Sequence, residues 1–315
     1  MEDMMQYTKE LNIFGKSVLI KNYGCSLNGG DYEEVTDDVK IRLSICPTHF
    51  CTGKCPFCSA RSMTGDKSFL DTEKLRRVLT ELHSMDIIAG IAITGGEPFT
   101  DVKLLNDIIE IIFDIFGLEL EISINTNGIG LKELRKIEKY LFIDTIHISR
   151  HHYDDTKNRE LFGIDVPDEK ELSEIVGREK DKRLFVFNCL LLNDGIGTKE
   201  EMKNYLEFAY RVGVPKVGFI TPMPVNDFVK KRRVSFTELF DRNDPELLYR
   251  RCLQDFGFCQ CTDGLYATKE GGLMHFYGRE TSLLVPEFSR RLVYTADNRL
   301  QTGYGENAEV IRDFS

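Results

Sequence analysis

The chain has 315 residues, 42% of them hydrophobic, which is enough for one large core or for a core with a smaller appended unit. Acidic residues outnumber basic ones by 51 to 41, giving a net charge of −10. This balance argues against a nucleic-acid binder, whose affinity comes mainly from clustered Lys and Arg. The N-terminus lacks a secretory pattern and no stretch approaches the ~18–20 apolar residues of a membrane span, so we expect a cytoplasmic protein.

The first 38 residues give few structural signals, and we expect 1–38 to be a leader segment packed on the main domain. From 39 to 224, short β-rich runs alternate with amphipathic helices. Strands are predicted at 39–45, 91–94, 119–125, 143–149, 184–191 and 217–221, and helices at 71–84, 102–115 and 131–140. A further helix is predicted to begin at Thr198, which forms a capping box with Glu201, and to end at Gly213.

Alternating strands and helices imply a parallel sheet with right-handed crossovers. Six such units are too few for a closed eight-stranded barrel, so we predict an α/β fold in which 39–224 form a partial (β/α)6 TIM barrel. The pattern changes after Pro224, where 251–261 is rich in cysteine and hairpins are predicted at 264–277 and 291–303. We expect 225–315 to be a C-terminal extension that covers the open side of the barrel.

Three cysteines, Cys51, Cys55 and Cys58, lie on the loop that follows the first predicted strand. In a reducing compartment, nine cysteines favour metal binding or catalysis over disulfides. Three thiolates spaced in this way can hold an iron–sulfur cluster and leave one iron without a protein ligand, while Gly53 lets the backbone fold tightly around it. A zinc site with Cys46 as fourth ligand is the alternative, although structural zinc sites usually take two separated pairs of ligands.

A second motif, Gly95-Gly96-Glu97-Pro98, stands at the end of the second predicted strand. Both motifs fall at the carboxyl ends of strands, where barrel active sites are assembled. The cysteine triplet has an aromatic residue, Phe57, just before its last member. Together with the Gly-Gly-Glu turn, it resembles the signature of the radical S-adenosylmethionine (radical SAM) superfamily.

This resemblance implies an enzyme with a [4Fe–4S] cluster whose open iron binds the amine and carboxylate of S-adenosylmethionine. One electron, from a donor such as flavodoxin or ferredoxin, then cleaves the sulfonium bond, and a 5′-deoxyadenosyl radical abstracts hydrogen from the substrate. The glycines of the second motif let the backbone approach closely, and a backbone carbonyl or Glu97 is expected to receive the ammonium group.

The segment 39–225 resembles, more specifically, the GTP cyclase family that begins molybdenum cofactor biosynthesis. The shared features are Arg42-Leu-Ser44, Thr126-Asn127-Gly128, Ile148-Ser149, Asn188-Cys-Leu-Leu and Phe219-Ile220-x-x-Met223-Pro224. By this resemblance, the residues expected around the cofactor are Phe57, Gly95, Gly96, Glu97, Thr126, Asn127, Ser149 and Met223. Each also has a structural explanation, since Phe and Met pack cores, Ser satisfies backbone groups and Asn-Gly makes turns.

The sequence departs from that family where a triphosphate would bind. The family's lysine on the fifth strand is replaced by Val186, and the sixth strand lacks the expected arginine. We therefore expect a different substrate, a small polar or nucleotide-like molecule. Arg150-His151-His152 follows the fourth strand, at the mouth of the predicted barrel. Because His transfers protons near neutral pH and Arg recognises carboxylate or phosphate, Arg150, His151 and His152 are the catalytic candidates, with a solvated loop as the alternative.

The C-terminal extension holds a second group of cysteines: Cys252, Cys259 and Cys261. Many superfamily members carry an auxiliary cluster in such an extension, called a Twitch or SPASM unit, so the resemblance implies a second iron–sulfur cluster here. The spacing of seven and two differs from that of the GTP cyclases, and zinc or free thiols stay open. Cys25, Cys46 or Cys189 are candidates for a fourth ligand, although Cys189 is better explained as a buried apolar residue.

Three functions compete. The leading one is an enzyme that abstracts hydrogen from a small polar molecule. The second is a maturase that modifies a ribosomally synthesised peptide, which the lack of an evident leader-binding domain in 1–38 disfavours. The third is a metal-bearing sensor or scaffold, against which the two intact motifs argue.

Overall fold

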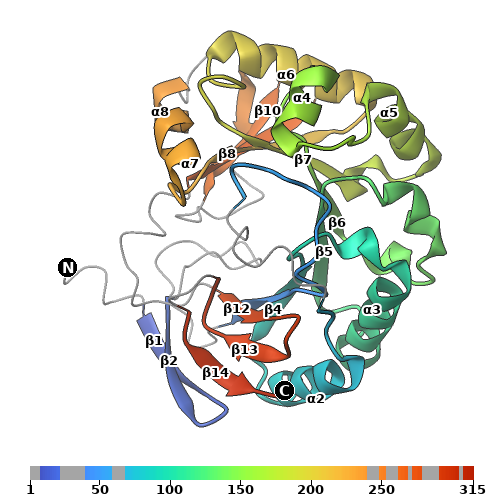
Figure 1. Ribbon diagram of the computed structural model, residues 1–315, viewed down its shortest axis with the longest axis vertical. Coiled ribbons are helices and arrows are strands. Elements are labelled where there is room, and N and C mark those ends of the chain that lie inside the picture. Colours follow the sequence, from blue (N-terminus) through green and yellow to red (C-terminus); the bar gives the residue numbers. More distant parts are fainter. Residues whose placement is uncertain are drawn as a thin grey trace.

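The computed structural model describes residues 8–21, 40–58, 68–239, 248–252, 262–268, 272–278, 291–304 and 308–315. Within them, one curved sheet surrounds a central axis and helices cover its outer face (Figure 1). The six predicted strands are present as β3 (Ile41–Ile45), β4 (Ile88–Ile93), β5 (Glu121–Thr126), β6 (Thr145–Ser149), β7 (Phe185–Leu190) and β8 (Lys216–Thr221). They pair in chain order and are all parallel, which confirms the predicted alternation of strands and helices.

Three predicted helices form on the outer face: α2 (Thr72–Ser84), α3 (Val102–Phe116) and α6 (Lys199–Val212). Helix α2 begins where the Asp71 carboxylate accepts hydrogen bonds from the backbone N–H groups of Glu73 and Lys74, at 2.9 and 3.1 Å. Helix α6 begins where the Thr198 hydroxyl accepts the Glu201 N–H at 3.2 Å. The predicted capping box is made only in this half, because the Glu201 carboxylate accepts no hydrogen bond from the Thr198 N–H.

The predicted helix at 131–140 is instead two 3₁₀ segments, η2 (Leu131–Lys136) and η3 (Tyr140–Phe142). The buried side chains Leu131, Leu134 and Ile137 are spaced by three residues, which is the period of a 3₁₀ helix. Further helices are η1 (Pro98–Thr100), α4 (Asp155–Phe162), α5 (Glu169–Arg178), η4 (Lys182–Leu184), α7 (Asp227–Arg232) and α8 (Phe236–Leu239). Among the described helices, none is long and apolar enough to cross a membrane.

Residues beyond 224 supply strands to both edges of the barrel sheet. β11 (Leu273–Gly278) pairs in parallel with β8, and β12 (Arg291–Tyr294) pairs in parallel with β3. The two predicted hairpins are confirmed, as β11 with β10 (Thr262–Thr268) and β12 with β13 (Arg299–Gln301). β9 (Leu248–Cys252) and β14 (Val310–Asp313) add antiparallel margins. The parallel run is therefore β12-β3-β4-β5-β6-β7-β8-β11, longer by β12 and β11 than the six predicted strands, and the C-terminal residues share its sheet.

Side chains alternate between the helix-covered face of this sheet and the barrel interior. On the outer face, the ring of Phe187 stacks on Phe208 of α6 and that of Phe219 meets Tyr205, each with ring centroids 5.6 Å apart. Because successive residues of a strand point to opposite faces, their neighbour Asn188 faces the interior.

The N-terminal segment contains a hairpin, β1 (Thr8–Ile13) and β2 (Lys16–Lys21), which lies outside the barrel sheet. It contacts the C-terminal margin, where the Lys16 ammonium donates to the Val310 carbonyl at 2.5 Å. Phe14 packs edge-on against Phe314 with ring centroids 5.8 Å apart. The two ends of the described chain are therefore joined beside β14.

Candidate functional site

The three cysteines of the first motif lie on one loop that follows the carboxyl end of β3, and all are half-buried. A Cβ atom added at Gly53 would lie 3.4 Å from the Sγ atoms of both Cys51 and Cys55, so these thiols flank the same point. The Gly53 N–H donates a hydrogen bond to Cys51 Sγ at 3.3 Å, and Cys55 Sγ lies 3.9 Å from the Phe162 carbonyl oxygen. An iron–sulfur cluster requires thiolate ligands, and this loop turns around a glycine and keeps its three thiols accessible, as such a cluster needs.

The Gly-Gly-Glu turn at the end of β4 packs directly on this loop. The Gly96 N–H donates to the Thr48 carbonyl at 2.9 Å, and a Cβ at Gly96 would lie only 2.0 Å from the Phe50 carbonyl oxygen. Gly95 has a φ of +114°, and a Cβ there would lie 2.9 Å from Cys46 Cβ. Both positions require glycine, because the backbone after β4 meets the cysteine loop with no room for a side chain.

The Glu97 carboxylate is buried and joins the carboxyl ends of β4 and β5. Its Oε1 accepts the Phe99 N–H at 3.1 Å and the Thr126 hydroxyl at 2.7 Å, while Oε2 accepts the Asn127 N–H at 2.8 Å. Burial raises the pKa of Glu97, and these hydrogen bonds oppose that shift. Because the carboxylate already accepts internal bonds, the backbone carbonyls are the better of the two expected acceptors for an ammonium group.

Cys51 lies beside this junction. Burial raises the pKa of the Cys51 thiol, the Glu97 carboxylate raises it further, and a hydrogen bond from the Asn127 side chain lowers it. A thiol in these surroundings is neutral by itself, and a bound metal is what would keep it deprotonated. The chemistry of the loop therefore suits a metal-held thiolate.

Aromatic contacts bring one predicted catalytic residue to the cysteine loop. The Phe57 ring meets the His151 ring edge-on, with centroids 4.6 Å apart and planes at 87°. His151 stacks on Phe162 at 5.1 Å with planes at 6°. The carboxyl end of β6 and the cysteine loop are thus joined through Phe57.

The buried His151 imidazole is neutral. Burial and the nearby Arg150 charge lower the pKa of His151 to about 3. Its Nδ1 accepts the Leu190 N–H at 3.3 Å, which assigns the ring proton to Nε2. This imidazole is a weak base that can donate a hydrogen bond from Nε2.

Arg150, the second catalytic candidate, is 1% exposed, and its side chain forms hydrogen bonds within the segment of chain that follows β6. Its guanidinium donates to the carbonyls of His152, Pro167 and Tyr153 at 2.8, 3.0 and 3.1 Å, and to the Asp155 carboxylate at 2.5 Å. These bonds hold the segment between β6 and α4. The geometry therefore favours a positioning role for Arg150 over contact with a substrate.

The remaining predicted residues stand near strand ends. His152 is buried, its Nδ1 accepts the Asp154 N–H at 2.9 Å, and burial lowers its pKa. Ser149 is the last residue of β6 and is half-buried. Met223 follows β8, and its carbonyl accepts the Val225 N–H at 2.8 Å. Ser149 and Met223 therefore lie at the carboxyl ends of β6 and β8, with β7 between these two strands in the sheet.

Two of the other cysteines are buried, and the rest lie outside the described side chains. Cys189 on β7 is 0% exposed, which confirms its reading as a buried apolar residue. Cys46 is 2% exposed, and burial raises its pKa to about 12. The thiols predicted for a second cluster lie outside the described side chains: Cys252, Cys259 and Cys261, as does Cys25. Within the described residues, no three His, Cys, Asp or Glu side chains converge as a single metal ion requires.

Sequence reasoning missed two residues that support the site from helices. Asn158 of α4 is fully buried, and its Oδ1 accepts the N–H groups of His151 and His152 at 2.9 and 3.2 Å. Tyr205 of α6 donates its hydroxyl to the Arg150 carbonyl at 2.6 Å. The one available signal was Asn158 itself, a polar residue four positions before the apolar Phe162 on the same helix face.

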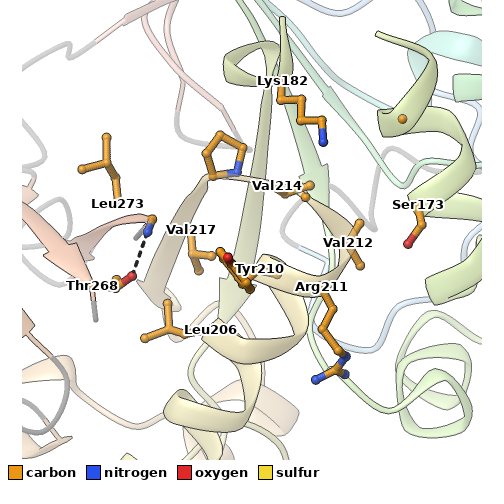
Figure 2. Close-up of a pocket in the computed structure, with 15 residues that line it drawn as sticks. Ser173, Lys182, Leu206, Tyr210, Arg211, Val212, Val214, Val217, Thr268 and Leu273 are labelled. Carbon is orange, nitrogen blue, oxygen red and sulfur yellow. Dashed lines mark hydrogen bonds between the residues drawn. The ribbon is translucent and has the colours of Figure 1, made fainter. Parts of the chain in front are cut away.

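A pocket of about 590 Å³ opens at the opposite end of the strands (Figure 2). It lies between the amino end of β8 and the carboxyl end of α6, and its lining includes Lys182, Leu206, Tyr210, Arg211 and Leu273. The cysteine loop follows the carboxyl end of β3, so this pocket is separate from the candidate site.

Comparison with known proteins shows which protein family the sequence matches. The family model of the radical SAM superfamily matches residues 45–228. The probable GTP 3′,8-cyclase of Saccharolobus islandicus (strain Y.N.15.51) is 30% identical over 194 residues, which cover 60% of this chain and 58% of that enzyme. The probable GTP 3′,8-cyclase of Sulfurisphaera tokodaii is 27% identical over 192 residues, covering 60% and 57%. The match thus spans less than two thirds of the length of these relatives.

Solved structures share the fold. SuiB of Streptococcus suis bound to its precursor peptide SuiA superposes with a TM-score of 0.58 at 14% identity, covering 88% of this chain and 64% of SuiB. SuiB bound to S-adenosylmethionine gives a TM-score of 0.54 at 13% identity, covering 87% and 63%. At these identities the likeness concerns the fold alone.

Proposed function

Because the chain belongs to the radical SAM superfamily, whose members are enzymes, we propose that it is a radical SAM enzyme whose [4Fe–4S] cluster is held by Cys51, Cys55 and Cys58. When bound, the cluster and S-adenosylmethionine supply the one-electron cleavage and the hydrogen abstraction characteristic of the superfamily. The observation that carries this assignment is the close approach of Gly96 to the cysteine loop, where a Cβ would lie 2.0 Å from the Phe50 carbonyl oxygen.

The residues proposed to surround S-adenosylmethionine come from the carboxyl ends of five strands, β3, β4, β5, β6 and β8. They are Phe57, Gly95, Gly96, Thr126, Asn127, Ser149 and Met223, with Glu97 bonded beneath them to Thr126 and Asn127. Gly95 and Gly96 bring backbone close to the cofactor, and Phe57 contributes an apolar wall that His151 supports from behind. An auxiliary cluster on Cys252, Cys259 and Cys261, and reduction by a flavodoxin or ferredoxin, belong to the same proposal.

The proposed substrate is a small polar or nucleotide-like molecule other than GTP. The strand position where related cyclases carry lysine is Val186 here, and it is 0% exposed. A peptide substrate, as seen for SuiB, is the alternative. Since SuiB shares only 14% identity with this chain, its peptide supports no closer assignment.

The proposal is tested by anaerobic reconstitution with iron and sulfide, followed by reduction with dithionite in the presence of S-adenosylmethionine. We expect three signals. The cluster should absorb in the visible region, the EPR spectrum of the reduced cluster should change when S-adenosylmethionine is added, and 5′-deoxyadenosine should form. Cys55→Ala should weaken the first of these three signals, since the proposed auxiliary cluster still absorbs, and should lose the other two. Cys189→Ala is the matched control, because Cys189 is buried in β7, and it should keep them.

A fully assembled cluster that neither changes its EPR spectrum with S-adenosylmethionine nor yields 5′-deoxyadenosine would overturn the proposal. Equal cluster content in the two cysteine variants would overturn the ligand assignment.

A further inference from the structure

Asn127 lies in the turn that follows β5 and is tied to the cysteine loop through Glu97. The Asn127 backbone N–H donates to Glu97 Oε2 at 2.8 Å. The Glu97 N–H in turn donates to the Phe50 carbonyl at 2.9 Å, and Phe50 directly precedes Cys51. Two hydrogen bonds thus connect Asn127 to the residue before the first cysteine of the loop.

The amide nitrogen of Asn127 is a buried donor without a full hydrogen bond. The residue is 8% exposed, and Nδ2 has no partner of normal distance and angle within the described part of the chain. The amide oxygen accepts the Ile129 N–H at 3.0 Å, which assigns the orientation of the amide and directs Nδ2 away from that bond. Because a buried N–H donor without an acceptor costs free energy, Nδ2 marks a place where an acceptor is expected.

The acceptor on which this nitrogen acts is the Cys51 sulfur. The Asn127 side chain lowers the pKa of the Cys51 thiol, as a donor directed at Sγ does. A neutral thiol is a weak acceptor, which agrees with the incomplete bond, whereas a thiolate that ligates iron is a stronger one. The Gly53 N–H already donates to the same sulfur at 3.3 Å. A cluster ligated by Cys51 would therefore give Nδ2 the acceptor that it lacks.

A negative group acts on the same sulfur in the opposite direction. The buried Glu97 carboxylate raises the pKa of Cys51, so it disfavours negative charge there. Reduction adds one electron to a cluster, and hydrogen bonds to the ligating sulfurs stabilise the added charge. The Asn127 amide therefore opposes the effect of Glu97.

We propose that Asn127 donates a hydrogen bond from Nδ2 to the Cys51 thiolate and thereby raises the reduction potential of the cluster. The inference rests on the proposed function, in which Asn127 lies beside S-adenosylmethionine, and it assigns the amide nitrogen to the cluster rather than to that cofactor. Asn127 acts through Cys51, so it is a positioning residue.

The test compares midpoint potentials of the reconstituted holoenzyme before S-adenosylmethionine is added. A redox titration follows the EPR signal that is absent from Cys55→Ala, which separates this cluster from the proposed auxiliary one. Asn127→Ser removes the amide without adding charge, and Asn127→Asp keeps an oxygen for the Ile129 N–H. At the potential where half of the wild-type cluster is reduced, the ratio of reduced to oxidised cluster should fall about three- to tenfold in Asn127→Ser, the effect of one hydrogen bond. The ratio should fall further in Asn127→Asp, because an added carboxylate also repels the electron.

Asn106→Ser and Asn106→Asp are the matched controls. Asn106 of α3 also accepts a backbone N–H with its Oδ1, from Glu138 at 2.8 Å, and its helix covers the outer face of the sheet. Both controls should titrate as the wild type does. All four variants should bind as much iron as the wild type.

Unchanged potentials in both Asn127 variants would overturn the inference, and weaker binding of S-adenosylmethionine by the same variants would assign the amide to that cofactor instead. Loss of the cluster from both variants would also overturn it, because Asn127 would then only hold the loop in place. Either result leaves the proposed function standing when the wild type forms 5′-deoxyadenosine. A wild type that forms no 5′-deoxyadenosine, but whose cluster potential falls in the Asn127 variants, would keep the inference and overturn the proposed function.

Discussion

At the scale of single residues, the site depends on Gly96. Its N–H bonds to the Thr48 carbonyl at 2.9 Å, so the turn after β4 and the cysteine loop are held backbone to backbone. A methyl group at Gly96 would overlap the Phe50 carbonyl oxygen, which belongs to main chain and has no rotamer by which to move away. The contact between the turn and the cysteine loop therefore requires a residue without a side chain at position 96.

Gly96→Ala is expected to displace the cysteine loop and lower the iron bound per chain after reconstitution by up to about half, the share of one of the two proposed clusters, measured by iron assay and visible absorbance. Gly177→Ala is the control, because it lies in helix α5 and a Cβ there meets nothing within 4 Å. It should keep full iron and gain stability by up to ~1 kcal/mol, since alanine is the better helix former. Equal iron content in both variants would contradict the role assigned to Gly96.

Site residues that belong to a local sequence motif were predicted better than the contacts between residues that lie far apart in the sequence. Spacing alone indicated the cysteine triplet and the Gly-Gly-Glu turn. The three bonds of Glu97 were not predictable in that way, because Thr126 and Asn127 approach it from a different strand. The same holds for His151, whose neutrality comes from burial against Phe57 and Phe162.

At the scale of elements, the Arg150 guanidinium joins β6 to the two helices that follow. It reaches the Asp155 carboxylate at the start of α4 and the Pro167 carbonyl just before α5. Its guanidinium carbon lies 4.9 Å from the Phe208 ring centroid of α6. The planar guanidinium of arginine has five N–H donors and can make these contacts in several directions at once, whereas the ammonium group of a lysine cannot.

Arg150→Lys should therefore destabilise the fold by about 2–4 kcal/mol, because it leaves buried carbonyls without donors. Arg211→Lys is the control, since Arg211 makes a two-pronged contact with Glu169, at 3.0 and 3.3 Å, on the surface. Arg211→Lys should lower the free energy of unfolding by less than ~1 kcal/mol. Urea unfolding followed by circular dichroism measures both, and equal shifts of the two midpoints would refute the difference in role.

The elements predicted correctly are those whose signal is local. Strands β3 to β8 are short apolar runs, and α2 and α6 begin at side-chain caps. Helix α4 was not predicted because its buried residues are only Asn158 and Phe162, too few for an apolar stripe. The segment at 131–140 was assigned to an α-helix although its buried residues repeat every third position.

At the scale of the whole molecule, the C-terminal residues complete the barrel sheet at both of its edges (Figure 1). β12 pairs with β3, whose residues stand some 250 positions earlier in the chain, and β11 pairs with β8. No local pattern in 291–294 indicates that partner, because a hairpin strand and a parallel edge strand have the same apolar character. The boundary predicted at 224 reflects a change of sequence pattern, whereas the sheet continues across it.

This continuity predicts how the molecule unfolds. Leu292 of β12 is 0% exposed and pairs with Leu43 of β3, so Leu292→Ala should cost about 2–5 kcal/mol and lower hydrogen-exchange protection in β3 as well as in β12. Leu118→Ala, at a side chain 75% exposed, should change stability by less than ~0.5 kcal/mol. Amide exchange read by mass spectrometry separates the two strands. If Leu292→Ala opened β12 while β3 kept its full protection, the C-terminal residues would be an independent unit that only abuts the barrel. Loss of protection in both strands together would mean that the edge of the barrel holding the cysteine loop is stabilised from the far end of the chain.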